Sequence, residues 1–140
     1  MTTLGIIILA GLGYLKGMGF YSQSKVMETG LIDGKISLCP ETPNCVSTTN
    51  TDDVHGISPI ETTLSFEEVL TVFQENDLDI IAQDDNYAHF TFKSTIMGYV
   101  DDIEILKVEN KVFIKSASRV GKSDLGANRK RVENLRKALK

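Results

Sequence analysis

The sequence is poor in the residues that build metal centres and nucleophile sites. It contains two cysteines and two histidines. Two cysteines alone are too few for a zinc site, and the spacing of Asp52 and His55, which could complete one, matches no standard zinc pattern. A catalytic thiol would need His55 or His89 as its base. We predict that the protein holds no metal and no cofactor.

The motifs of several other functional classes are also missing. The sequence has no nucleophile elbow, no phosphate-cradling loop and no metal-binding motif. It has no zinc finger or other familiar nucleic-acid-binding motif, and its isoelectric point is about 5.1. These absences argue against nucleic acid as a partner and leave the class of any enzymatic reaction undefined.

Basic residues are scarce in the middle of the chain and concentrated at its end. From Asp52 to Glu104, Lys93 is the only lysine or arginine among thirteen acidic residues. The final helix predicted below carries six basic residues against the single Glu133, namely Arg129, Lys130, Arg131, Arg136, Lys137 and Lys140. Opposite charges favour docking of this helix onto its own domain.

The stretch from Ser116 to Lys140 predicts a strand end, a polar loop and an amphipathic helix. An apolar stripe at helical spacing is expected on the helix, formed by Leu125, Val132, Leu135 and Leu139. Asn128 falls within this stripe, so its amide needs buried hydrogen-bond partners. Ser123 or Asp124 is expected to cap the helix start, and Gly121 can take a positive φ.

The loop before this helix is the predicted ligand site. Arginine can bind phosphate or carboxylate with two parallel hydrogen bonds, which favours Arg119, Arg129 and Arg131 as contacts. The alternative is that Asn128 pins the loop and the arginines form internal ion pairs.

The N-terminal residues predict a membrane anchor over 1–21. Residues Leu4 to Leu15 form an uninterrupted apolar run. If the amine of Lys16 reaches the membrane surface while its stem stays among the apolar residues, the segment extends to Tyr21. No basic start and no small-residue cleavage pattern accompany it, so an uncleaved single-pass helix is favoured over a removed signal or a buried core helix. A polar linker is expected over 22–37, with a short strand near 35–38, followed by one domain over 38–140.

Cys39 and Cys45 enclose a short proline-containing loop. In an oxidising compartment they could form a disulfide. A metal-binding role and a catalytic or redox thiol are the alternatives. A disulfide or a pair of structural thiols is the favoured interpretation.

The middle of the chain predicts an α+β domain. Ser65 and Glu68 form a capping box before a helix that carries Phe66, Val69, Leu70 and Phe73 at core spacing and ends near Asn76. Four strands are expected to follow, over 78–82, 87–93, 100–108 and 112–118. Their short connections predict a four-stranded antiparallel meander packed with two amphipathic helices.

Two adjacent carboxylates, Asp101 and Asp102, lie in the third of these strands. Neighbours in a strand point to opposite faces, so one is expected to meet Arg119 or Arg129 and the other to meet water. Their roles could be a structural ion pair, cation binding or general-base catalysis.

Three segments of the chain resemble one known family. CPETPNCVST, FKSTIMGYVDDIEI and SASRVGKSDLGANRKRVENLR occur in order over about residues 38–140 and are similar to the domain of unknown function 1499 family. The motif residues carried onto this chain are Cys39, Pro40, Pro43, Asn44, Cys45, Val46, Ser47, Asp101, Asp102, Ser116, Ser118, Arg119, Gly121, Asp124, Gly126, Asn128, Arg129 and Arg131.

The resemblance implies a fold but no chemistry, because the family has no assigned activity. Its members are commonly bacterial, also occur in plastids, and often carry an N-terminal lipoprotein signal or membrane segment. This chain lacks the lipoprotein cysteine. An envelope setting implied by the family would suit a Cys39–Cys45 disulfide and would place the domain outside the cytoplasm.

The predicted function is non-catalytic binding of an envelope protein or a small anionic ligand. The expected contacts are Asn44, Ser47, Asp101, Asp102, Arg119, Asp124, Asn128, Arg129 and Arg131. One alternative is a hydrolase-like enzyme in which Asp101 or Asp102 acts as a base and Arg119 or Arg129 stabilises charge. The other is a redox or metal role for the two cysteines.

Overall fold

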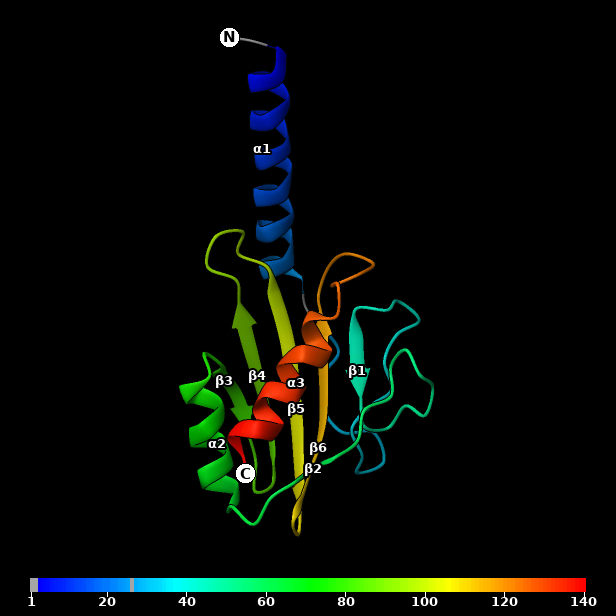
Figure 1. The fold of residues 1–140 in the computed structure, drawn as a ribbon. Helices are drawn as coiled ribbons and strands as arrows, with labels where there is room; N and C mark the ends of the chain where they lie inside the picture. The colour runs from blue at the N-terminus through cyan, green and yellow to red at the C-terminus, as the bar shows by residue number, and fades with distance from the viewer. Residues whose placement is uncertain (1–2, 26) are drawn as a thin grey trace.

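An antiparallel sheet of six strands forms the centre of the fold (Figure 1). The computed structural model describes residues 3–25 and 27–140. The strands run in the order β1-β6-β5-β4-β3, and β2 pairs with β6 beside β1. Their bounds are β1 (Cys45–Ser47), β2 (Ile60–Glu61), β3 (Asp79–Gln83), β4 (Tyr87–Lys93), β5 (Val100–Val108) and β6 (Lys111–Ser118).

The predicted meander is confirmed as β3 to β6, and the bounds of β4 and β5 are those predicted. The prediction of four strands in total was wrong, because β1 and β2 both add to the edge of β6. These two strands contain three and two residues. Such short segments show no period-two alternation that a sequence pattern could reveal.

Helices α2 (Phe66–Glu75) and α3 (Ala127–Ala138) cover one face of the sheet, called the helix face below (Figure 1). The capping box of α2 is present, and Val69, Leu70 and Phe73 are buried as predicted. The core lies between these helices and strand residues of alternate positions, including Ala88, Phe90, Ile103, Ile105, Val112 and Ile114.

Helix α3 begins later than its apolar pattern suggested. Val132, Leu135 and Leu139 are buried as predicted, but Leu125 is 97% exposed. Leu125 lies before the first helical residue and has a φ of 53°. It therefore does not share the helical period of the stripe, and its assignment to the core was wrong.

The opposite face of the sheet is covered by residues 27–40, called the strap below. Ile36 is buried, and its carbonyl accepts a hydrogen bond from Thr49 Oγ1 at 2.5 Å. Gly30 N donates to Glu104 Oε1 at 2.6 Å. The strand predicted near 35–38 is not formed, and the strap has a single isolated bridge between Ile32 and Lys35. The polar linker of the sequence prediction is therefore the cover of the second face, called the strap face.

Helix α1 (Thr3–Ser24) extends away from the sheet (Figure 1). Its C-terminal end contacts the start of β5, where Ser22 Oγ accepts from Val100 N at 2.9 Å. Among residues 3–25 and 27–140, no helix has both the length and the apolar character needed to cross a membrane. The predicted single-pass anchor is therefore not supported. Residues 1 and 2 of the predicted anchor and residue 26 of the predicted linker lie outside the described residues.

Strand β3 forms one edge of the sheet and is irregular. Its register with β4 shifts between Ile80, opposite Phe90, and Ala82, opposite His89. Ile81 is the extra residue, and it is 57% exposed. An extra residue of this kind is a β-bulge, which bends and twists the strand locally.

Candidate functional site

The two adjacent carboxylates lie on opposite faces of the sheet, as strand geometry requires. Asp101 lies on the helix face with Ile103 and Ser116, and Asp102 lies on the strap face. The prediction that one of them meets Arg119 is confirmed for Asp102. The prediction that the other meets water was wrong, since Asp101 Oδ2 accepts from Arg131 Nη2 at 2.7 Å.

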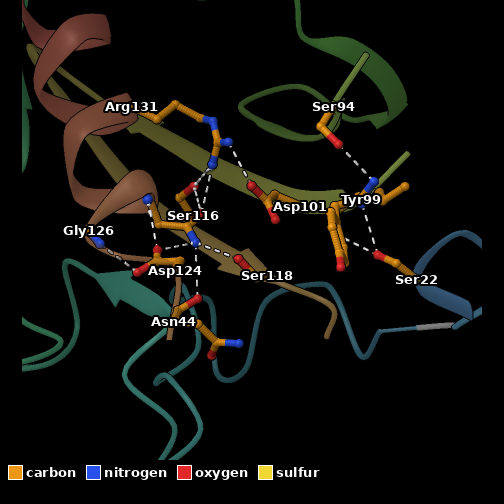
Figure 2. Close-up of polar contacts among 12 residues, drawn as sticks. Ser22, Asn44, Ser94, Tyr99, Asp101, Ser116, Ser118, Asp124, Gly126 and Arg131 are labelled. Atoms are coloured by element: carbon orange, nitrogen blue, oxygen red, sulfur yellow. Dashed lines mark hydrogen bonds and ion pairs between the residues drawn. The ribbon is translucent and has the colours of Figure 1, made fainter. Parts of the chain in front are cut away.

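Figure 2 shows the polar cluster on the helix face, with Asn44, Ser116, Ser118, Asp124 and Arg131. These residues surround the amide of Asn128. Asn128 has no exposed surface. Its Oδ1 accepts from Ser116 Oγ at 2.6 Å and from Arg131 Nη1 at 2.8 Å. Its Nδ2 donates to the carbonyl of Asn44 at 3.1 Å and to Ser118 Oγ at 2.9 Å. Asn128 therefore joins α3, β6 and the segment before β1.

Asp124 bonds the start of α3, but it is not the N-cap. The N-cap residue is Gly126, so the prediction of Ser123 or Asp124 in that place was wrong. Asp124 Oδ1 accepts from Gly126 N at 2.9 Å and its Oδ2 accepts from Asn128 N at 2.9 Å. Burial alone would raise the pKa of Asp124, but the hydrogen bonds from Asn128 and Gly126 outweigh it and the pKa is lowered. The ionised Asp124 therefore fixes the loop to the first turn of the helix.

The donors of the helix-face cluster are used inside the protein. Arg131 bonds Ser116, Asn128 and Asp101, and its guanidinium lies 4.6 Å from the centre of the Phe92 ring. Arg129 is remote from both carboxylates, since its Nη2 donates to the carbonyl of Val54 at 3.1 Å. The geometry therefore favours the structural alternative for this loop over an anion site.

The strap face carries a second cluster, centred on Asp102, which is 4% exposed. Asp102 Oδ2 accepts from Arg119 Nε at 2.7 Å, and Oδ1 accepts from Arg119 Nη2 at 2.9 Å. His89 Nε2 lies 2.7 Å from the same Oδ1. Burial alone would raise the pKa of Asp102, but hydrogen bonds from Arg119 and His89 outweigh it and the pKa is lowered. The Asp102 carboxylate is therefore ionised, and the guanidinium of Arg119 neutralises its charge.

A row of polar side chains crosses the strap face next to Asp102. His89, Glu104, Lys115 and Ser47 are directly opposite one another on β4, β5, β6 and β1. Each of the four is less than 9% exposed. Glu104 Oε1 accepts from Tyr87 Oη at 2.7 Å, and both burial and this bond raise the pKa of Tyr87. A sheet face that the alternation predicts to be solvent-facing is thus buried.

A cavity among the described residues lies along the strap, and Lys115 of this row is part of its lining. It has a volume of about 1170 Å³. Its lining combines apolar strap residues, which include Met27, Leu31, Ile32, Ile36 and Leu38, with the charged strap residues Glu28, Asp33 and Lys35. Lys115 is the lining residue that comes from the sheet. Ligand cavities are commonly apolar with a few placed polar groups. Two other cavities, of about 340 and 360 Å³, are much smaller.

Residues 35–139 match the family model described as Protein of unknown function (DUF1499). The chain belongs to this family. The three motifs that suggested this membership are therefore confirmed, and the match begins three residues before the predicted domain start. No curated protein and no solved structure matches the chain.

The motif cysteines of this DUF1499 domain form the predicted disulfide, Cys39–Cys45, with 5.8 Å between their Cα atoms. The bond attaches the strap to β1. The sulfur atoms are therefore neither metal ligands nor free nucleophiles, and the described residues contain no cluster of three or more metal-ligating side chains. His55 contacts Asp52 instead, with 2.7 Å between Nδ1 and Oδ2.

Residues of the family motifs occur in both polar clusters, the one around Asn128 and the one around Asp102. The sequence prediction placed all of these residues in a single site. Ser47 was expected near the final loop, yet its Oγ donates to the carbonyl of Ser37 in the strap at 2.9 Å. Asn44 does lie at the final loop, where its Nδ2 donates to Gly121 O at 2.8 Å. Three strap-face residues were missed, namely Tyr87, Glu104 and Lys115. The available signal was the run of ionisable residues at alternate positions of β4, β5 and β6.

Proposed function

We propose that this domain binds a small molecule with an apolar body in the cavity along the strap. The observation that carries the proposal is the cavity itself, which is about three times larger in volume than the next. Its volume of about 1170 Å³ suits a ligand of drug size or larger. This proposal keeps the binding function predicted from the sequence. It assigns the ligand site to the strap and not to the loop before α3.

The apolar surface of the strap supports the proposal. Leu31, Ile32 and Leu38 are 37%, 65% and 59% exposed, and all three line the cavity. Contiguous exposed apolar side chains beside a cavity are typical of a ligand-binding surface. A bound apolar molecule would remove this surface from water, and burial of one such side chain contributes about 1.5–3 kcal/mol.

Binding is favoured over hydrolysis because the carboxylates are poorly suited to accept protons. Asp102 is held in its ionised form by Arg119 and His89, which use both of its oxygens. Asp101 is bonded to Arg131 on the other face. Neither carboxylate lines the cavity. A base with a lowered pKa and occupied lone pairs is a weak general base near neutral pH.

The proposal is tested with the neutral fluorescent probe N-phenyl-1-naphthylamine. Leu38→Glu places a charge on the cavity wall at an exposed position, so the fold is expected to persist. We expect this variant to weaken probe binding about tenfold, the loss of roughly one buried side-chain contact. Fluorescence titration gives the affinity, and circular dichroism checks the fold.

Two exposed apolar residues away from the cavity provide matched controls. Ile96→Glu and Leu9→Glu change side chains that are 79% and 56% exposed and do not line the cavity. Both variants should bind the probe like the unaltered protein. Unchanged binding in Leu38→Glu together with lost binding in Leu9→Glu would place the probe on α1 and reject the proposal.

We also propose that the domain acts in an oxidising compartment, such as a cell envelope. The support is the pairing of both cysteines of the chain in one disulfide. Disulfides persist mainly in oxidising compartments. Fusion of the full chain to a reporter that is active only in an oxidising compartment tests this, and an inactive reporter on a folded fusion would contradict it.

A further inference from the structure

Among the described residues, the amine of Lys115 in the lining of the strap cavity forms no ion pair. Lys115 is 7% exposed. Its Nζ donates to Ser37 Oγ at 2.8 Å, and none of the ion pairs within 4.0 Å among the described residues includes it. An ammonium group has three N–H donors. A buried lysine is almost always paired with an anion, so this site is incomplete without one.

The nearby carboxylates do not fill this role. Glu28 and Asp33 also line the cavity, but among the described residues neither forms an ion pair with Lys115. Glu104 lies directly opposite Lys115 on the sheet, but its Oε1 accepts from Gly30 N and Tyr87 Oη. Asp102 is bonded to Arg119 and His89. Burial lowers the pKa of Lys115, and the charges of Glu104 and Asp102 offset this only in part. Direct contact with an anion would stabilise the charged amine and raise its pKa.

Building on the proposed function, we propose that the ligand is an aliphatic molecule with a single anionic head group that pairs with Lys115. The tail of the ligand lies along the apolar strap residues Leu31, Ile32 and Leu38. The head group replaces the missing partner of the Lys115 ammonium and leaves its bond to Ser37 in place. The ligand class is therefore an amphiphile with one anionic head group, a carboxylate or a phosphate.

The test compares ligands that share one tail and differ in the head group. Dodecanoate, dodecyl phosphate, dodecanol and dodecylamine are titrated against the full chain, below their micelle-forming concentrations, by displacement of N-phenyl-1-naphthylamine. We expect at least one anion to bind about tenfold more tightly than dodecanol, and dodecylamine to bind most weakly. The tighter of the two anions identifies the head group.

Substitutions of two lysines show which of them gives the preference for an anionic head group over dodecanol. Lys115→Met should bring anion affinity to that of dodecanol without changing the affinity of dodecanol, and Lys115→Arg should retain a preference for the anion. Lys35 also lines the cavity but is exposed, so Lys35→Met should preserve the preference. Loss of the preference in Lys35→Met but not in Lys115→Met would overturn the inference.

A pH series on the unaltered chain gives a second measurement that needs no variant. Because the pKa of Lys115 is lowered from 10.5, the amine loses its proton as the pH rises towards that value. Dodecanoate affinity should fall over this alkaline range, whereas dodecanol affinity should not. Equal affinity for dodecanoate and dodecanol at neutral pH rejects the anionic head group but keeps the apolar cavity. Failure of every ligand and of the neutral probe to bind rejects the cavity as well.

Discussion

The two faces of the sheet use buried polar groups in different ways. On the helix face, Asn128 is surrounded by partners from α3, β6 and the segment before β1, and its donors and acceptors are all used. On the strap face, Asp102 is fully bonded, but Lys115, two strands away from His89, has one bond and no anion. A complete polar network fixes a structure, whereas an incomplete one beside a cavity indicates where a ligand is missing.

The largest expected change in stability comes from neutralising the carboxylate of Asp102. Asp102→Asn leaves the buried side of Arg119 without its counter-charge, and we expect a loss of about 3–5 kcal/mol in the free energy of unfolding. Asp101→Asn is the matched change on the helix face, where one ion pair to Arg131 is lost at a partly exposed position. It should cost about 1–2 kcal/mol. Urea unfolding of both variants measures the difference, and equal losses would show that the two faces are not distinct.

The next effect is removal of the central amide of the helix face. Asn128→Ala leaves Ser116, Ser118 and the Asn44 carbonyl without their shared partner, and should destabilise the domain by about 2–3 kcal/mol. Probe binding in the strap cavity should be unchanged. Asn134→Ala, at an exposed position of the same helix, should change stability by less than about 0.5 kcal/mol. Reduced probe affinity in Asn128→Ala at temperatures where it is folded would contradict the separation of the faces.

Removal of the disulfide should affect the strap most. A variant with both Cys39→Ser and Cys45→Ser loses a link that spans six positions in sequence, and we expect a cost of about 2 kcal/mol in the free energy of unfolding from the freed unfolded chain. Hydrogen exchange should therefore rise more in the strap than in α3. An equal rise in the two segments would show that the disulfide does not hold the strap in the folded state.

A smaller effect is expected from acid. The folded pKa of Asp102 lies below its ordinary value of 3.8, so its contribution to stability is present above pH 3.8 and is lost as the pH falls through the folded pKa. Stability of the unaltered chain should therefore fall more steeply than that of Asp102→Asn as the pH is lowered from 3.8. Parallel curves from denaturant unfolding would show that Asp102 has no part in the acid response.

The smallest effect is expected at Arg129, which was predicted to be a site residue. Its guanidinium contacts the carbonyls of Asp53 and Val54 at the surface. Arg129→Ala should change the free energy of unfolding by less than about 0.5 kcal/mol and leave ligand affinity unaltered. A loss comparable to that of Asp101→Asn would require a role for Arg129 that its contacts do not provide.

Much of the fold could be predicted from the sequence because its signals are local. The capping box at Ser65 and the alternation of Ala88, Phe90 and Phe92 depend on residues close in the chain, and both predicted the correct element. Strand alternation also predicted that the two carboxylates face opposite sides and that one of them meets Arg119 or Arg129, which is confirmed by the pair of Asp102 and Arg119. The partner of Asp101 did not follow from this pattern, since Arg131 lies thirty positions away on a helix that begins later than its pattern implied.

The strap face could not be predicted for a different reason. Polar residues at alternate positions of a strand usually indicate a face in contact with water. Here the strap covers them by bonding Glu104 through the backbone of Gly30 and Lys115 through Ser37. Every residue except proline has a backbone N–H, so the identity of Gly30 does not reveal that it donates to Glu104. The two residues are also seventy-four positions apart. Knowledge of which segment covers the sheet was therefore needed to find the cavity.

The bulge at Ile81 has a consequence for how copies of this domain meet at high concentration. An exposed, regular edge strand offers a row of backbone donors and acceptors to another molecule. The extra residue in β3 interrupts that row and turns an isoleucine outward. Deleting Ile81 would leave the edge straight and evenly spaced, and such a chain should assemble into higher-order β-structures that the natural sequence avoids.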